Sequence, residues 1–160
     1  MNKAYLLIGG NLGDRKQNLE KARALLSQHC GTIVNVSSIY ETDAWGNTEQ
    51  PVFLNQAVEL ETEFNAKKLM RLILKIEKIM GRIRKDKYGP RNIDIDILLF
   101  NEEEHNYTFL RIPHPELHKR RFALVSLAEI APEAKHSVFN KTIKTLLNEC
   151  SDKLSVKKMT

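Results

Sequence analysis

The sequence predicts an α+β domain with a ferredoxin-like βαββαβ core and additional short helices and strands at its C-terminal end. Two observations lead to this fold class. Short apolar runs alternate with longer segments in which apolar residues recur at helical spacing. The order along the chain is strand, helix, strand, strand, helix, strand, which is the order of the split βαβ arrangement.

Four short apolar runs predict the strands of this core. Glycine, proline or asparagine lies near an end of each run, and these residues punctuate strands. The expected strands are residues 4–8, 32–40, 53–60 and 93–100. The last one is unusual because it contains Asp94 and Asp96, and aspartate is depleted in strands.

Two longer segments predict the helices that cover the sheet. The first is expected to begin at Asp14, a residue type that caps helices, and to end at Gly31. The second is expected to begin at Asn65 and to end at Gly81, with one apolar face between them.

A single domain is expected over residues 1–160, because this length suits one hydrophobic core. Short helices are expected around residues 121–130 and 141–150. Residues 151–160 are polar and are expected to form a frayed tail.

Composition indicates a globular protein and leaves its partner open. The chain is 42% hydrophobic and 28% charged, with a net charge of +5. This charge permits binding of nucleic acid, anionic membrane or anionic metabolites and selects none of them. Cys30 and Cys150 form no CxxC motif, and no apolar run suits a secretion signal or a membrane span. A reduced cytoplasmic protein is the simplest expectation, although a disulfide stays open.

The most informative segment is residues 82–100, where a cationic loop runs into the strand that carries both aspartates. Side chains alternate along a strand, so Asp94 and Asp96 are expected to share one face. Two carboxylates held this close repel each other unless a cation lies between them. Hard oxygen ligands suit Mg²⁺, which completes its shell with water and substrate phosphates.

The loop supplies the complementary charge for such a ligand. Residues 82–91 contain five positive side chains and one negative side chain, and arginine pairs well with phosphate oxygens. Loop and strand together predict a site for a polyphosphate with magnesium. The alternative is an edge strand with solvated aspartates after a solvated basic loop. This alternative requires that neither the aspartate pair nor the adjacent cationic loop has a function.

Other candidate sites are weaker on their own. Residues 9–13 could form a phosphate nest at a helix start, and a structural turn explains them equally well. His114 lies in a rigid Pro-His-Pro turn, and a lone histidine is usually structural. Trp45 and Phe53 could stack on a flat ligand, although core packing is the simpler explanation for Phe53. Asn55 interrupts an apolar strand and needs a polar partner, such as the edge of a heterocycle, if it faces inward.

The chain resembles a known enzyme family. Residues 88–98, YGPRNIDIDIL, are similar to the signature of the 6-hydroxymethyl-7,8-dihydropterin pyrophosphokinases of folate biosynthesis. The resemblance spans nearly the whole chain, with further similar blocks at residues 5–14, 37–42, 50–58, 81–84, 112–115, 121–124 and 129–133. It implies a cytoplasmic enzyme that transfers pyrophosphate from ATP to the hydroxymethyl group of a reduced pterin, releases AMP and uses two Mg²⁺ ions.

The resemblance also implies roles for individual residues. The catalytic set would be Arg82, Arg91, Asp94 and Asp96, with both aspartates as the magnesium ligands. The ATP-binding set would be Glu77, Arg84, Lys85, Ile97, His114 and Arg120. The pterin slot would comprise Thr42, Asp43, Ala44, Trp45, Phe53, Asn55 and Phe122. The two phenylalanines would stack on the pterin, and Asn55 would read its amide edge.

A few positions depart from the family pattern. Tyr88 stands where the family often has tryptophan, Leu74 where it often has glutamine, and Pro115 where it commonly has tyrosine. These differences affect the expected loop closure and adenine contacts. They leave the aspartate pair and the phosphate-binding arginines unchanged.

ATP and the reduced pterin are the expected partners of a monomer, with no nucleic acid and no membrane. The alternative is a basic ferredoxin-like module that binds RNA or nucleotide without turnover. RNA-binding modules of this fold usually expose aromatic residues on their central strands. This chain carries aspartates there, which would repel phosphate without a metal.

Overall fold

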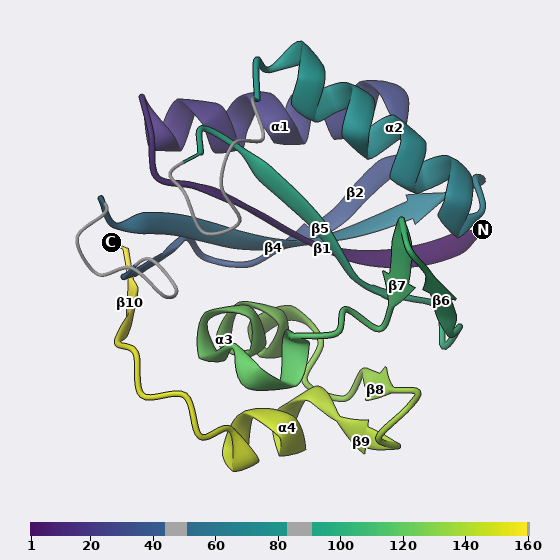
Figure 1. Ribbon diagram of the computed structural model, residues 1–160, viewed down its shortest axis with the longest axis vertical. Helices are drawn as coiled ribbons and strands as arrows, with labels where there is room; N and C mark the ends of the chain where they lie inside the picture. Colours follow the sequence, from purple (N-terminus) through teal and green to yellow (C-terminus); the bar gives the residue numbers. More distant parts are fainter. Residues whose placement is uncertain (44–50, 83–90, 160) are drawn as a thin grey trace.

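A computed structural model describes residues 1–43, 51–82 and 91–159. Within these residues the centre is a six-stranded antiparallel sheet with helices on both faces (Figure 1). One face is covered by α1 (Arg15–His29) and α2 (Ala66–Ile79), and the other by α3 (Arg121–Ile130), with α4 (Ile143–Glu149) packed beyond it. No helix in these ranges is long and apolar enough to cross a lipid bilayer.

The strand order confirms the predicted fold class. The strands of the sheet are β1 (Asn2–Gly10), β2 (Thr32–Val36), β3 (Tyr40–Thr42), β4 (Phe53–Thr62), β5 (Asp94–Phe100) and β10 (Val156–Lys158). They lie in the order β10-β3-β4-β1-β5, and β2 also pairs with β4. With β2 and β3 taken as two parts of one strand, the first four strands and two helices follow the ferredoxin-like order.

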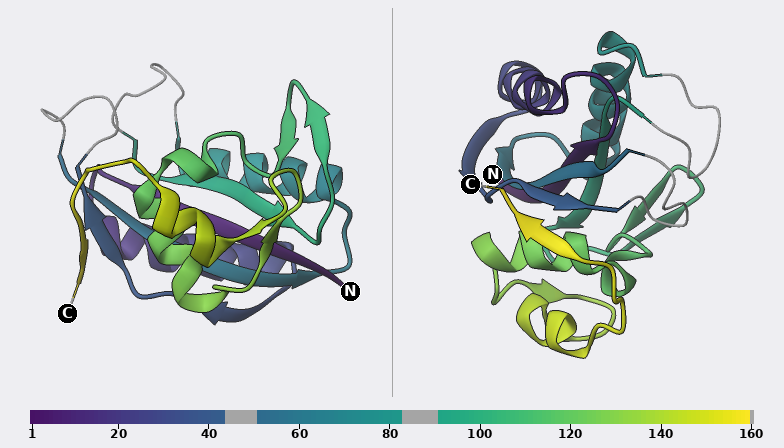
Figure 2. Two further views of the ribbon diagram at one scale, coloured as in Figure 1. Left: turned by 90° about the horizontal axis from the view of Figure 1, so that it is seen from below. Right: turned by 90° about the vertical axis from the view of Figure 1, so that its left-hand side faces the viewer.

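The remaining described elements are short. They are the hairpins β6 (His105–Tyr107) with β7 (Leu110–Ile112) and β8 (Lys135–His136) with β9 (Lys141–Thr142), and a 3-10 helix, η1 (Leu117–Lys119). Figure 2 shows the β6–β7 hairpin projecting from the body of the molecule.

Both main helices begin at the predicted caps. The Asp14 carboxylate accepts a hydrogen bond from the Gln17 N–H at 3.1 Å, and the Asn65 side-chain oxygen accepts one from the Lys68 N–H at 2.9 Å. Each cap satisfies a donor that the helix itself leaves unpaired.

The strand expected at residues 32–40 is wrong in one respect, because residues 37–39 interrupt it. Val36 pairs with Val58 and Tyr40 pairs with Asn55. Residues 37–39 therefore lie opposite only the two residues 56–57 of β4. The Ser37 hydroxyl accepts from the Ala57 N–H at 2.9 Å and replaces a backbone acceptor of the ladder. A side chain therefore takes over the pairing at the break.

The expectation of a frayed tail is also wrong for residues 156–159, within the part of the tail that the structure describes. β10 pairs with β3, with Val156 opposite Thr42, and the Met159 N–H donates to the Ile39 carbonyl at 2.9 Å. Figure 2 shows this strand, in yellow, beside the sheet. Its stabilising partner lies more than a hundred residues away in the sequence, so the local polar composition does not reveal it.

The hydrophobic core has one part on each face of the sheet. Ile95 and Ile97 are buried among the residues that pack on α1 and α2, whereas Leu98 and Leu99 pack with α3 and α4. A register shift between Tyr5 and Leu6 allows the two leucines to share a face. Strand alternation then places the aspartates of β5 on the face that α3 covers.

A hydrogen-bonded carboxylate fixes α3 to the break between β2 and β3. Glu129 accepts from the Ser38 N–H at 2.8 Å, from the Ser38 hydroxyl at 3.1 Å and from the Tyr40 hydroxyl. Burial, followed by this last bond, raises the pKa of Tyr40 to about 12. Partial burial opposes the charge of Glu129, but the bonds from Tyr40 and Ser38 outweigh it and lower the pKa of Glu129.

We expect Glu129→Gln to lower the free energy of unfolding at pH 7 by about 0.5–1 kcal/mol, since the bonds are charge-assisted but the glutamate is exposed. A lowered folded-state pKa stabilises the fold above the ordinary glutamate pKa. That stabilisation disappears as the pH falls through the folded-state value, so the parent–variant difference should shrink in acid.

Urea unfolding between about pH 3 and pH 7, a range that extends below the ordinary glutamate pKa, measures this difference. Glu133→Gln, at an exposed glutamate just beyond α3, is the control and should stay within a few tenths of a kcal/mol of the parent. A Glu129→Gln difference that is constant with pH would contradict the assignment.

Candidate active site

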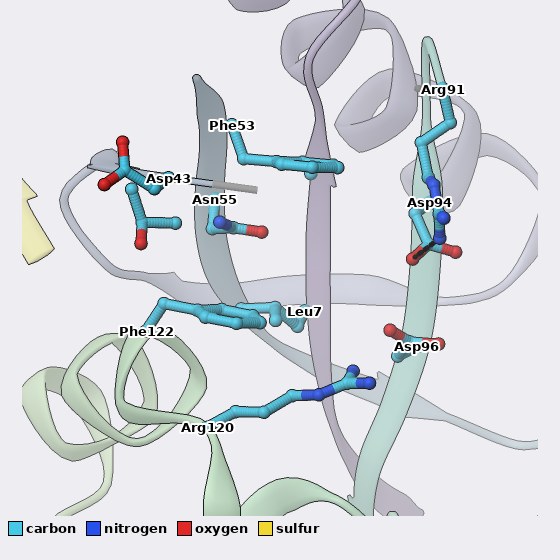
Figure 3. Close-up of a pocket in the computed structure, with 11 residues that line it drawn as sticks. Leu7, Asp43, Phe53, Asn55, Arg91, Asp94, Asp96, Arg120 and Phe122 are labelled. Atoms are coloured by element: carbon cyan, nitrogen blue, oxygen red, sulfur yellow. Dashed lines mark hydrogen bonds and ion pairs between the residues drawn. The ribbon is translucent and has the colours of Figure 1, made fainter. Parts of the chain in front are cut away.

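An open cavity of ≈ 680 Å³, counting its solvent-open space, lies on the face of the sheet that α3 covers (Figure 3). Its lining residues are Leu7, Gly9, Thr42, Asp43, Phe53, Asn55, Arg91, Asp94, Asp96, Arg120 and Phe122. All of these except Leu7 and Gly9 are site residues expected from the sequence. They come from β1, β3, β4 and β5, from the start of α3 and from the segments beside these elements.

One half of the cavity is an aromatic slot. Phe53, at the start of β4, and Phe122, in the first turn of α3, lie on opposite sides of it, and the Asn55 amide lies between them (Figure 3). The Thr42 hydroxyl is buried and has no hydrogen-bond partner in the described part of the chain. The slot therefore offers two flat apolar walls and polar groups that a ligand can satisfy.

Gly9 makes room for the Asn55 side chain. It pairs with Asn55 on β4 and with Asp94 on β5, so these three residues form one row across the sheet. A Cβ on Gly9 would lie 2.3 Å from the Asn55 Oδ1 and 2.8 Å from the Leu54 carbonyl. The row needs a residue without a side chain at its centre.

The segment after Gly9 serves a structural purpose and does not form a phosphate nest. The N–H groups of Asn11 and Leu12 both donate to the Arg91 carbonyl, at 2.9 and 3.2 Å. A Cβ on Gly10 would lie 2.3 Å from the Asn92 carbonyl. These two donors are thus used by the protein itself, which favours the structural turn.

Asp94 lies between two arginines on the opposite side of the cavity. Its Oδ1 is 2.8 Å from the Arg82 Nη1, and its Oδ2 is 3.3 Å from the Arg91 Nη1. The same Arg82 nitrogen donates to the Glu77 Oε2 at 2.8 Å, and this oxygen also accepts from the Ile95 N–H at 2.8 Å. Glu77 is almost fully buried, so its charge is balanced inside the protein by Arg82.

Asp96 is less well compensated than Asp94. Desolvation, followed by repulsion from Asp94, raises the pKa of Asp96 to about 8. Desolvation, followed by the charge of Arg120, lowers the pKa of His114 to about 4. The His114 Nδ1 accepts from the Glu116 N–H at 3.1 Å, so the neutral ring carries its proton on Nε2, which lies 3.9 Å from the Asp96 Oδ1.

The backbone of β5 also fixes His114 beside the aspartates. Leu98 lies at the register shift of β5, and its carbonyl accepts a hydrogen bond from the His114 N–H at 3.0 Å. The irregular strand therefore provides the acceptor that holds this histidine.

The predicted site residues fall into three groups. Most of them line the cavity or, like Arg82 and His114, contact an aspartate that does. Glu77 is connected to the cavity through Arg82. The Ile97 side chain is instead buried in the core on the opposite face and does not line the cavity, so its expected contact with ATP stays a prediction. Ala44, Trp45, Arg84 and Lys85 lie outside the described residues.

Comparison with known proteins shows the family of the chain. Residues 5–132 match the family model described as 7,8-dihydro-6-hydroxymethylpterin-pyrophosphokinase (HPPK). The chain belongs to this family. It is 47% identical over 135 residues to the 2-amino-4-hydroxy-6-hydroxymethyldihydropteridine pyrophosphokinase of Bacillus subtilis, covering 84% of this chain and 81% of the relative. The enzyme of the same name from Aquifex aeolicus is 40% identical, with coverage of 90% and 89%.

Solved structures show the same fold. The HPPK-DHPS of Plasmodium falciparum, determined with SDX-DHP, superposes with a TM-score of 0.74 at 22% identity. The match covers 93% of this chain and 43% of that longer chain. The resemblance noted in the sequence is therefore confirmed at the level of family and fold.

We expect Gly9→Ala to displace the Asn55 side chain and to lower the free energy of unfolding by about 1–3 kcal/mol, because the new methyl group has no room. The position of the Asn55 side-chain amide signal in NMR spectra measures the displacement. Gly81→Ala is the control: its φ of 81° is strained for alanine, but its Cβ would meet nothing. An unmoved Asn55 signal in Gly9→Ala would show that the row tolerates a methyl group.

Proposed function

We propose that this chain transfers pyrophosphate from ATP to the hydroxymethyl group of 6-hydroxymethyl-7,8-dihydropterin and releases AMP, a step of folate biosynthesis. The observation that best supports the proposal is that the aromatic slot and the aspartates line one cavity. An aromatic slot that contains the unpaired Thr42 hydroxyl opens directly onto two aspartates flanked by arginines. Membership of the pyrophosphokinase family supports the same reaction.

The slot suits a pterin in shape and in polarity. A flat bicyclic ring would stack between Phe53 and Phe122, and each such contact contributes about 0.5–1.5 kcal/mol beyond burial. The Asn55 amide offers both a donor and an acceptor to the amide edge of the ring. The Thr42 hydroxyl would find there the hydrogen-bond partner that the described residues do not provide.

The row of Asn55, Gly9 and Asp94 sets the distance between the aromatic slot and the aspartates. Asn55 and Asp94 lie on either side of Gly9, and neighbouring strands are about 4.8 Å apart, so their backbones are separated by roughly 10 Å. A pterin ring held at Asn55 would therefore extend its substituent toward the aspartates. This geometry supports the hydroxymethyl group as the reacting part of the substrate.

The cationic residues around the aspartates suit the phosphates of ATP. Arg82 and Arg91 would exchange part of their contact with Asp94 for phosphate oxygens, which guanidinium groups bind in a bidentate manner. Arg120 lines the cavity, and the charge of this arginine already influences Asp96 and His114. The His114 Nε2–H would be a neutral donor on the same side.

The residues present fit two Mg²⁺ ions held by Asp94 and Asp96. Both carboxylates line one cavity, where burial and then repulsion from Asp94 raise the pKa of Asp96, and a cation between them would offset that repulsion. No group of three or more candidate metal-ligating side chains occurs in the described residues. A two-carboxylate set agrees with magnesium, which takes its other ligands from water and phosphates. When bound, the ions would neutralise the phosphate charge that otherwise repels the nucleophile.

The reaction forms one bond and breaks one. The hydroxymethyl oxygen attacks the β-phosphorus of ATP and loses its proton, while the bond from the β-phosphorus to the α–β bridging oxygen breaks and AMP leaves. The protein orients the two substrates, and Arg82 and Arg91 stabilise the charge of the transition state. We assign no side chain as general base.

The proposal also covers the cellular compartment and the oligomeric state of the protein. Cys30 and Cys150 are both free, which supports a reducing compartment such as the cytoplasm. We also propose that the protein acts as a monomer. The family assignment favours this enzyme over the alternative of an RNA- or nucleotide-binding module without turnover.

Release of AMP from ATP tests the function. We expect it to require both Mg²⁺ and the reduced pterin, with pyrophosphorylated pterin formed in equal amount. AMP release that is independent of the pterin, or no release at all, would overturn the proposal.

We expect Asp96→Ala to reduce turnover by about 10³-fold or more, because half of the hard oxygen ligands are lost. The melting temperature without Mg²⁺ should stay the same or rise, since a desolvated carboxylate that Asp94 repels is removed. Titration calorimetry with Mg²⁺ and an ATP analogue gives a readout independent of turnover, and it should show weaker binding. Asp14→Asn, which keeps a capping residue far from the aspartates, is the control; near-normal binding by Asp96→Ala would rule out the metal assignment.

We expect Asn55→Ala to weaken pterin binding by about 1–3 kcal/mol, which is roughly 5- to 150-fold, because the heterocycle edge loses its partner. Binding of an ATP analogue with Mg²⁺ should change much less, since Asn55 lies in the aromatic slot. Calorimetry with each ligand separately measures both effects. Equal weakening of the two ligands would show that Asn55 does not read the pterin.

A further inference from the structure

Asn11 uses both ends of its side-chain amide to join two distant segments. It is buried, with 2% of its surface exposed, in the connection between β1 and α1. Its Nδ2 donates to the Pro51 carbonyl at 3.0 Å, and its Oδ1 accepts from the Arg91 N–H at 2.9 Å. The Asn11 N–H also donates to the Arg91 carbonyl, so the backbone of Arg91 is held on both sides.

Each of these segments leads into a different half of the cavity. Pro51 lies two residues before Phe53, a wall of the aromatic slot, and the Arg15 guanidinium holds the intervening Val52 carbonyl at 2.9 Å. Arg91 reaches Asp94 with its side chain, and its guanidinium lies 6.0 Å from the centre of the Phe53 ring. Asn11 is thus bonded to the backbone beside both halves.

We propose that Asn11 is a positioning residue that fixes the aromatic slot relative to the phosphate-binding arginine Arg91. The role rests on the proposed function, because it concerns the alignment of the two substrates. The task needs one donor and one acceptor on a short buried side chain, which asparagine provides and aspartate or leucine does not. Asn11 acts through Arg91 and Phe53 and is not expected to touch either substrate.

Loss of the Asn11 side chain should lower mainly the rate of the chemical step. In-line transfer requires the hydroxymethyl oxygen and the β-phosphorus to meet within a narrow range of geometry, and a displacement of about 1 Å can reduce the rate by about 10²-fold. A loosened connection would allow each half of the cavity to bind its own ligand with less change. The expected signature of Asn11→Ala is therefore a lower kcat with smaller changes in the separate affinities.

β1 offers a matched control at its other end. The Asn2 Nδ2 donates to the Phe64 carbonyl at 2.9 Å, and its Oδ1 accepts from the Asn101 Nδ2 at 3.1 Å. Asn2 therefore also uses both ends of its amide, but it lies far along the strand from Gly9 and the cavity. Asn2→Ala should change stability without changing turnover.

Steady-state and single-turnover kinetics of the full chain test the role. We expect Asn11→Ala to lower kcat by about 10- to 100-fold. Asn11→Asp keeps the acceptor for the Arg91 N–H but loses the donor to Pro51, so its loss should be smaller and should appear more in the pterin KM. Because Asn11 acts largely through Arg91, the double variant Asn11→Ala/Arg91→Ala should be little slower than Arg91→Ala alone.

Three results would overturn the role of Asn11. They are a kcat of Asn11→Ala within twofold of the parent, losses that multiply fully in the double variant, and an equal loss of kcat in Asn2→Ala. If the parent itself releases no AMP in the presence of the pterin and Mg²⁺, the proposed function fails, and the role of Asn11 fails with it. A fully active parent with an equally active Asn11→Ala overturns the positioning role alone.

Discussion

The antiparallel pairing of β1 with both β4 and β5 determines where every other part of the site can lie. The pairing places Gly9 between Asn55 and Asp94 and brings residues far apart in the sequence into one row. The absence of a side chain at Gly9 leaves the face of the sheet open at this point. The helices on the opposite face stabilise the sheet, while α3 closes the side of the cavity with Phe122.

Electrostatic balance is the second constraint on the site. Three carboxylates, those of Glu77, Asp94 and Asp96, lie close enough to influence one another, and the guanidinium groups of Arg82 and Arg91 offset much of this charge. The balance is uneven, because Asp96 receives the least compensation. A site of this kind favours a ligand that carries its own cations, as a metal-bound nucleotide does.

The elements whose signals lie within a few neighbouring residues could be predicted from the sequence. Helix caps at Asp14 and Asn65 and the shared face of Asp94 and Asp96 follow from spacing and residue type. The break after β2, the pairing of β10 and the bonds of Asn11 depend on partners far along the chain, so no local pattern contains them. Strand alternation places the Ile97 side chain on the face opposite the aspartates, whereas its predicted role in ATP binding came only from the family resemblance.

The pairing of β10 with β3 gives residues 156–158 a structural role that their polar composition does not indicate. Val156 lies opposite Thr42, the residue whose buried hydroxyl faces the aromatic slot without a partner in the described part of the chain. The tail therefore forms the outer support of one edge of the substrate cavity. Changes in residues 156–158 would reach the slot through a backbone ladder, although none of these residues lines it.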